Sequence, residues 1–169
     1  MTPLRNVPVR WRAYSLAMKN ADGEANTAQG ALRVVEAVWA DHGDEPIGRL
    51  YTEMGTRFIV RRDVSPGAVP DALTAAGLDP SYAAAGADER WDDEIRGSMA
   101  EAIDLVGPEV GVPILVFRDG DATAAIFGPV VSPTPRGEEA LALWDHVVGL
   151  AWSPGFYELK RSRTGPPEL

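Results

Sequence analysis

The fold is decided by the stretch Gly111-Val-Pro-Ile-Leu-Val-Phe-Arg-Asp-Gly-Asp-Ala-Thr-Ala-Ala-Ile-Phe-Gly128, whose pattern predicts a β-hairpin. Ile114 to Phe117 is a continuous apolar run, which predicts a strand buried on both faces. Asp119-Gly120 favours a type I′ turn, because that turn needs positive φ at both central residues. Thr123 to Phe127 predicts the returning strand, and Gly128-Pro129 ends it.

Pro113 stands at the mouth of the first predicted strand. A proline cannot donate a hydrogen bond to a strand ladder, so it belongs at the first residue of a strand or at a special peptide bond. We therefore expect a cis Val112-Pro113 peptide. The alternative is an ordinary trans proline that opens the strand, since few X-Pro bonds are cis.

Upstream of the hairpin the hydrophobic period changes once. Apolar and polar residues alternate from Val7 to Leu16, which predicts a strand, with a loop over residues 17–23. From about Glu24 to Val106 the apolar residues recur at helical spacing, which predicts a helical block. Helix ends are expected at glycines, prolines and aspartates, namely Gly43, Pro46, Gly77, Asp79-Pro80 and Asp88.

Downstream of the hairpin, residues 129–135 form a proline-rich connection, and residues 136–152 predict an amphipathic helix. Phe156-Tyr157 is expected to anchor a short last helix. The order strand, helical block, hairpin and helix is similar to the second half of a thioredoxin fold. An inserted helical block of this kind is typical of disulfide oxidoreductases of the DsbA type.

Composition excludes several function classes. The chain has 169 residues, enough for one domain with its own core, and a net charge of −9, which argues against a nucleic-acid partner. Apolar runs are too short for a membrane span, and the N-terminus lacks a signal-peptide pattern, so a cytoplasmic protein without a membrane partner is expected. The chain contains no cysteine, which excludes disulfides and thiol chemistry by this chain alone. With His42 and His146 as its two histidines, it is not expected to bind a metal.

Two further clusters have structural interpretations. The acidic residues of segment 88–94 are interpreted as a helix N-terminus and a solvated face rather than a metal site. Asp145 and His146 are adjacent on a predicted helix and point in different directions, so they are not interpreted as a catalytic pair.

Longer segments carry a resemblance to a known family. They include Ser15-Leu-Ala-Met-Lys-Asn20, Leu50-Tyr-Thr-Glu-Met-Gly-Thr-Arg57, Val106-Gly-Pro-Glu-Val-Gly-Val-Pro113, Phe127-Gly-Pro-Val-Val-Ser-Pro-Thr-Pro-Arg-Gly-Glu-Glu139 and Pro154-Gly-Phe-Tyr-Glu-Leu-Lys-Arg161. In these segments the chain resembles the actinobacterial DsbA-like family that includes the mycothiol-dependent nitroreductases. The resemblance covers nearly the whole chain.

The resemblance implies an α/β, thioredoxin-like fold of the DsbA type with a helical insertion, lacking the first strand and helix. It implies one domain over residues 1–169, with an inserted block at 24–106 and a C-terminal half at 107–161. In the family the missing helix carries a Cys-Pro-x-Cys motif, and Met1 stands where that helix should end. The family tends to have a histidine soon after the triplet that is Gly55-Thr-Arg57 here, whereas this chain continues with Phe58-Ile-Val-Arg61, so that position is apolar.

The resemblance also implies a thiol–disulfide oxidoreductase function, with mycothiol as reductant and a low-molecular-weight thiol or small molecule as partner. A homodimer is left open. The implied substrate-binding residues are Val112 and Pro113, whose backbone would pair with an extended thiol substrate, and Asn20, near the substrate pocket. An ordinary turn asparagine is the alternative for Asn20. The chain holds no catalytic residue of its own.

Three readings of function stay open. In the first, the recorded start of an oxidoreductase lies too far downstream, and the chain is a truncated form without redox activity by itself. It would then be less stable than a longer form, because unpaired strand edges cost free energy. In the second, the chain is a cysteine-free protein that binds thiols or peptides. In the third, it is a relative of the kappa-type glutathione transferases.

Overall fold

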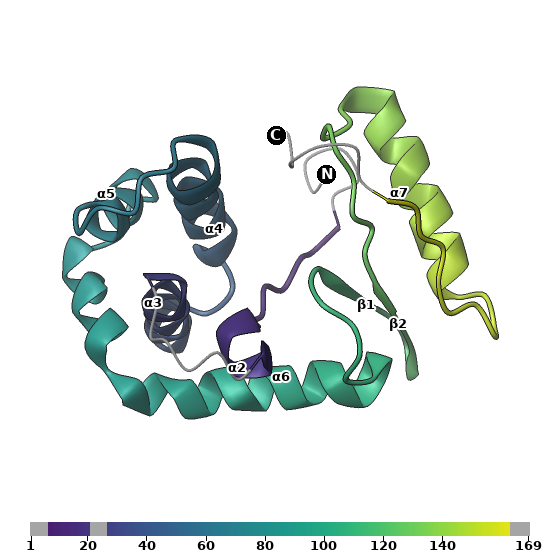
Figure 1. Cartoon of the computed structure of the whole chain (residues 1–169), viewed down its shortest axis with the longest axis horizontal. Coiled ribbons are helices and arrows are strands. Elements are labelled where there is room, and N and C mark those ends of the chain that lie inside the picture. The colour runs from purple at the N-terminus through teal and green to yellow at the C-terminus, as the bar shows by residue number, and fades with distance from the viewer. Residues whose placement is uncertain (1–6, 21–26, 163–169) are drawn as a thin grey trace. The chain divides into compact units, whose positions relative to one another are not determined.

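The structure is a computed structural model that describes residues 7–20 and 27–162. The chain divides into two compact units (Figure 1). The helical unit comprises residues 9–101, and the hairpin unit comprises residues 7–8 and 102–162 of the described chain. Together they form a helix-rich mixed α/β protein whose described sheet has two antiparallel strands.

The helical unit confirms the predicted helical block. Its elements are α2 (Leu16–Asn20), α3 (Thr27–His42), α4 (Ile47–Gly55), the π-helical turn η1 (Thr56–Val60), α5 (Ala68–Ala75), the 3-10 helices η2 (Pro80–Ala87) and η3 (Glu89–Trp91), and most of α6 (Asp92–Val106). Gly43 and Gly77 have positive φ where helices end, as predicted, because glycine adopts this conformation without a steric cost. The Asp79 side chain caps η2 by accepting a hydrogen bond from the Ser81 backbone N–H.

The core of the helical unit lies among α3, α4 and α5. Its fully buried members include Val38, Leu50 and Leu73. The helix α3 also meets η2 at a pair of glycines, where a Cβ on Gly30 would lie 3.3 Å from the Gly86 carbonyl oxygen. A Cβ at either glycine would therefore require the facing backbone to move by a few tenths of an ångström.

The strand predicted from Val7 to Leu16 is wrong. Residues 7–15 have no strand partner in the described chain, and Leu16 already begins α2, so the expected loop from residue 17 is helical as far as Asn20. Burial accounts for the period-two pattern only in part, since Ala13 and Ser15 are buried but Val9 is 41% exposed. Trp11 stacks on Tyr51 of α4, with ring centroids 4.5 Å apart. A period-two pattern therefore occurs here without a strand.

The hairpin unit confirms the central prediction. Strand β1 (Ile114–Asp119) pairs antiparallel with β2 (Ala122–Phe127), and Ile114 lies opposite Phe127. The predicted helix is α7 (Gly137–Ala151), which lies beside the hairpin (Figure 1). Phe117 of β1 and Trp144 of α7 make an edge-to-face contact. The Val112-Pro113 peptide is cis, as predicted, and the Gly128-Pro129 and Ser132-Pro133 peptides are cis as well.

Three details of the hairpin unit differ from prediction. The turn residues are Gly120 and Asp121, and of the two only Gly120 has positive φ, which fits a type II′ rather than a type I′ turn. Strand β1 is not buried on both faces, because Val116 is 40% exposed in a sheet of two strands. Residues 156–157 form no helix, and Tyr157 is 90% exposed.

Across residues 7–20 and 27–162, no helix combines the length and the apolar character needed to cross a membrane.

The core of the helical unit predicts that substituting a buried leucine by alanine lowers the free energy of unfolding more than substituting an exposed one. Leu50 is fully buried, so Leu50→Ala should lower the free energy of unfolding by about 2–5 kcal/mol, through lost transfer energy and a cavity. Leu16 is 46% exposed, so Leu16→Ala should cost about 1 kcal/mol or less. Urea unfolding followed by circular dichroism measures both, and equal losses would contradict the assigned core.

Candidate functional site

The predicted substrate-binding residues fall in both units. Asn20 is the last residue of α2 in the helical unit, and its side chain is exposed. It therefore ends a helix rather than lying in a loop after a strand, and its φ is not positive. Val112 and Pro113 are exposed in the hairpin unit, directly before β1.

At Val112 and Pro113 the hairpin ladder gives way to free backbone. The Gly128 N–H donates to the Pro113 carbonyl at 2.8 Å, which extends the ladder one residue beyond β1. Val112 takes part in no backbone hydrogen bond within the described chain. The edge of β1 that faces away from β2 is also unpaired in the described sheet. An unpaired edge of this kind can accept an added extended segment.

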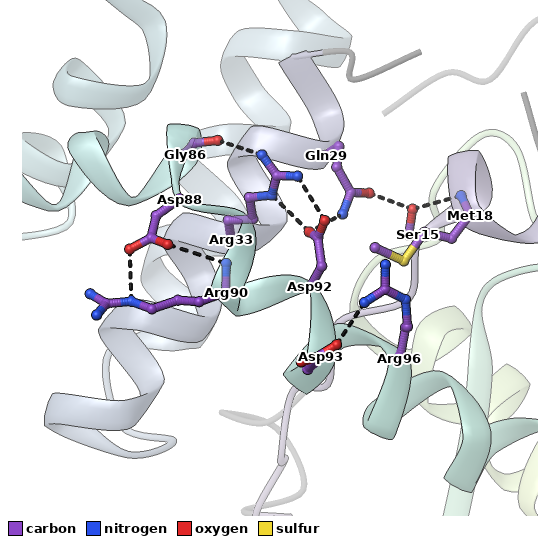
Figure 2. Close-up of polar contacts among 10 residues, drawn as sticks. All are labelled: Ser15, Met18, Gln29, Arg33, Gly86, Asp88, Arg90, Asp92, Asp93 and Arg96. Atoms are coloured by element: carbon purple, nitrogen blue, oxygen red, sulfur yellow. Dashed lines mark hydrogen bonds and ion pairs between the residues drawn. The ribbon is translucent and has the colours of Figure 1, made fainter. Parts of the chain in front are cut away.

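Ser15 fixes the start of the helix that carries Asn20. Its hydroxyl accepts a hydrogen bond from the Met18 N–H at 3.1 Å, the position of an N-cap bond for α2. The same hydroxyl donates to Gln29 Oε1 on α3 at 2.6 Å (Figure 2). Both side chains are buried, so α2 is tied to the interior of the helical unit.

A buried ion pair continues this network. Arg33 binds Asp92 with both arms of its guanidinium, Nε to Oδ1 and Nη2 to Oδ2, each at 2.7 Å (Figure 2). The Gln29 side-chain amide donates to the same Asp92 Oδ1 at 2.8 Å. The third nitrogen of Arg33, Nη1, donates to the Gly86 carbonyl at 3.2 Å. One arginine thereby links α3, η2 and the first residue of α6.

The charges of this pair stabilise each other. The bond from Arg33 holds the pKa of the Asp92 carboxyl below its usual value, against the opposing effect of burial and with further help from Gln29. The bond to Asp92 correspondingly raises the pKa of Arg33. Arg33 and Asp92 are 6% and 8% exposed, so both charges depend on each other rather than on water.

The acidic segment 88–94 has mixed roles. Asp88 accepts from the Arg90 N–H at 3.2 Å, at the start of η3, and Asp93 pairs with Arg96 at 2.7 Å. These contacts agree with a helix N-terminus. For Asp92 the predicted solvated face is wrong, because its carboxylate is buried against Arg33. Within the described chain no group of three or more acidic or histidine side chains is placed to hold a metal.

Sequence reasoning missed Gln29 and Arg33. The available signal was their spacing of four residues, which places two polar side chains on one face of α3 next to the buried Ala31 and Val34. Polar side chains at such positions need buried partners.

The ion pair predicts strong coupling in a double-mutant cycle. Arg33→Met leaves a buried carboxylate unpaired and should cost about 3–5 kcal/mol, and Asp92→Asn should cost a similar amount. The double variant should lose less free energy of unfolding than the two single variants added together, because it leaves no buried charge without a partner. Urea unfolding measures all three. Arg90→Met, which breaks an exposed pair with Asp88, is the control and should change stability by at most about 1 kcal/mol.

The same pair predicts a pH dependence. Folding lowers the pKa of the Asp92 carboxyl below its ordinary value of 3.8. The ionised carboxylate therefore contributes fully to the free energy of unfolding above pH 3.8, and this contribution is lost as the pH falls through the lower pKa of the folded state. The stability difference between the natural chain and Asp92→Asn should thus narrow below pH 3.8. A difference that stays constant on acidification would contradict the assigned charge state.

Two comparisons with known proteins bear on these residues. A family model described as "Rv2466c-like: Mycothiol-dependent nitroreductase Rv2466c" matches residues 1–161. A curated relative from Mycobacterium tuberculosis (strain ATCC 25618 / H37Rv), named "Uncharacterized protein Rv2286c", is 28% identical over 176 residues. That match covers 94% of this chain and 70% of the relative.

The family match takes in both units, from the extended segment before α2 to the residues after α7. It includes the Ser15–Gln29–Asp92–Arg33 network as well as the residues before β1. The chain therefore belongs to the Rv2466c-like family, the mycothiol-dependent nitroreductases.

Proposed function

We propose that this chain is the thiol-binding part of a DsbA-like, mycothiol-dependent reductase and has no redox turnover by itself. The proposal includes a single thioredoxin-like domain over residues 1–169, with residues 24–106 as its inserted helical block and residues 107–161 as its C-terminal half. The observation that carries it is the open backbone at Val112 beside the unpaired edge of β1, in a chain of this family.

The free backbone groups along β1 can form hydrogen bonds with the amide groups of an extended thiol. A segment lying along the outer edge of β1 would meet N–H and C=O groups that have no partner in the described sheet. Val112 is the residue at which these free backbone groups begin. The ladder between the strands ends at the next residue, Pro113, whose carbonyl accepts the hydrogen bond from Gly128. Affinity would then come from main-chain hydrogen bonds, which depend little on the side chain at position 112.

Asn20 would supply a side-chain contact. Its amide can both donate and accept, as a thiol carrying hydroxyl and amide groups requires. The N-cap at Ser15 and the buried network behind it hold α2, and therefore Asn20, in a defined place within the helical unit. We propose that Asn20 contacts the polar part of mycothiol.

The electron balance explains why this chain alone does not turn over. Reduction of a nitro group to a nitroso group takes two electrons and two protons and releases water. Two thiols supply these when they join as a disulfide. The chain has no cysteine, so every thiol in such a reaction must come from outside the 169 residues, either from mycothiol or from another polypeptide segment.

The purified 169-residue chain should show no thiol–disulfide exchange activity. With a thiol reductant present, the rate of insulin reduction should equal the uncatalysed background, because a thiolate nucleophile is lacking. The positive control is a thioredoxin at the same concentration. Sustained reduction above background would remove this part of the proposal and leave the binding part to be tested separately.

Mycothiol should bind at the predicted residues. Titration with mycothiol, followed by amide NMR, should shift and protect the Val112 N–H, because that group would gain a hydrogen bond. Asn20→Ala should weaken binding about three- to tenfold, the loss of roughly one hydrogen bond. Thr52→Ala is the control, since the Thr52 hydroxyl bonds within its own helix to the Gly48 carbonyl.

If mycothiol produces no saturable shift at Val112 or Asn20, the proposed thiol site is wrong. If an extended peptide protects Val112 and mycothiol does not, the chain is instead a peptide-binding protein.

A further inference from the structure

The helical unit contains an apolar crevice that the proposed function does not use. Its volume is about 300 Å³, at the lower end of the range of small-molecule pockets. Its lining comes from α3, η2, the start of α5 and the loop before α5. All of these elements belong to the helical unit.

Small and apolar residues shape the crevice. Gly30 and Gly86 both line it and face each other between α3 and η2, so backbone rather than side chains forms this part of its wall. Val34, Val69 and Ala83 supply apolar surface. The result is a space suited to a flat, apolar group.

The rim is formed by the loop after η1, and this loop is held at several points. The Asp63 N–H donates to the Arg57 carbonyl at 2.9 Å, and the Arg57 side chain reaches the Asp71 carbonyl on α5 at 3.0 Å. Val64 and Pro66 line the crevice, yet Val64 is 65% exposed. An apolar side chain that is both exposed and at the rim is available to contact a ligand.

Arg62 lies two residues before Val64, in the loop that forms this rim. Its φ is +52°, a left-handed conformation that is uncommon for arginine. Its Cα lies within about 7.6 Å of the Val64 Cα, because two peptide units separate them. Its exposed side chain has no ion-pair or hydrogen-bond partner in the described chain.

Two other charged side chains near the rim already have partners. The Asp63 carboxylate accepts from the Ser65 N–H at 3.0 Å, and Arg57 is paired with Glu53 at 2.7 Å. The Ser65 hydrogen bonds lower the pKa of the Asp63 carboxyl, with a smaller contribution from Arg61. The Arg61 side chain, like that of Arg62, has no ion-pair or hydrogen-bond partner in the described chain, and Arg62 is the closer of the two to Val64 in sequence, in a chain with a net charge of −9.

We propose that this crevice binds a small aromatic carboxylate. The ring would lie between the glycine wall and the apolar side chains, and the carboxylate would lie at the rim next to Arg62. This site is separate from the thiol-binding residues of the proposed function and does not depend on them.

The test uses 1-naphthoate as the probe and the neutral 1-naphthamide as its matched partner. Methyl NMR of the full chain should show saturable shifts at Val34, Val69 and Ala83 on addition of 1-naphthoate. The naphthamide should bind more weakly. Arg62→Asn should weaken naphthoate binding about two- to fivefold, as for an exposed ion pair, and should leave naphthamide binding unchanged. Asparagine tolerates the left-handed conformation, so the loop should keep its shape.

Two further variants complete the test. Arg118→Asn removes an exposed arginine from β1, outside the helical unit, and should leave naphthoate binding unchanged. Ala83→Leu should fill the crevice and weaken both probes. The proposal is overturned if the three methyl groups do not respond to 1-naphthoate. It is also overturned if naphthamide binds as tightly as naphthoate, or if Arg118→Asn weakens naphthoate as much as Arg62→Asn.

Discussion

The helical unit depends on one buried contact, the two-armed pair between Arg33 and Asp92. The apolar core lies among α3, α4 and α5, whereas α2 and the start of α6 contribute a smaller cluster built around Ala13, Ile95 and Met99. Through Gly86, Gln29 and Ser15 the pair fixes η2 and α2 relative to α3. Hydrogen bonds have directions, so they define these positions more sharply than a small apolar cluster does.

A buried ion pair of this kind is weak support for stability, because removing two charges from water costs several kcal/mol. Its contribution is to the positioning of η2 and α2. Asn20 lies on a helix of five residues, too short to be stable by itself. The helix is placed by the cap at Ser15, and Ser15 is placed by Gln29 and Asp92. The location of a candidate binding residue thus depends on a network of buried polar side chains.

Periodicity predicted most of the fold and little of the network. The helices, their glycine ends, the hairpin and α7 follow from local residue patterns, and they were placed to within a few residues. The segment before α2 was mistaken for a strand, because its apolar and polar residues alternate as they do in a half-buried strand. Asp92 was assigned to a solvated face, because its partner Arg33 lies 59 residues away in sequence. A contact between residues so far apart does not change the local pattern of apolar and polar residues, so a single sequence does not reveal it.

The lack of cysteine narrows what the rest of the chain can do. Catalysis by thiol exchange requires a nucleophilic sulfur, and a protein without one can still recognise a thiol through its backbone. Backbone recognition needs an open strand edge, which is also a risk for aggregation. In the described sheet the outer edge of β1 is open, and it begins beside Val112 and ends in the charged residues Arg118 and Asp119. Charges at a strand end disfavour pairing with other chains, so Arg118 and Asp119 oppose edge-to-edge pairing at this end of β1.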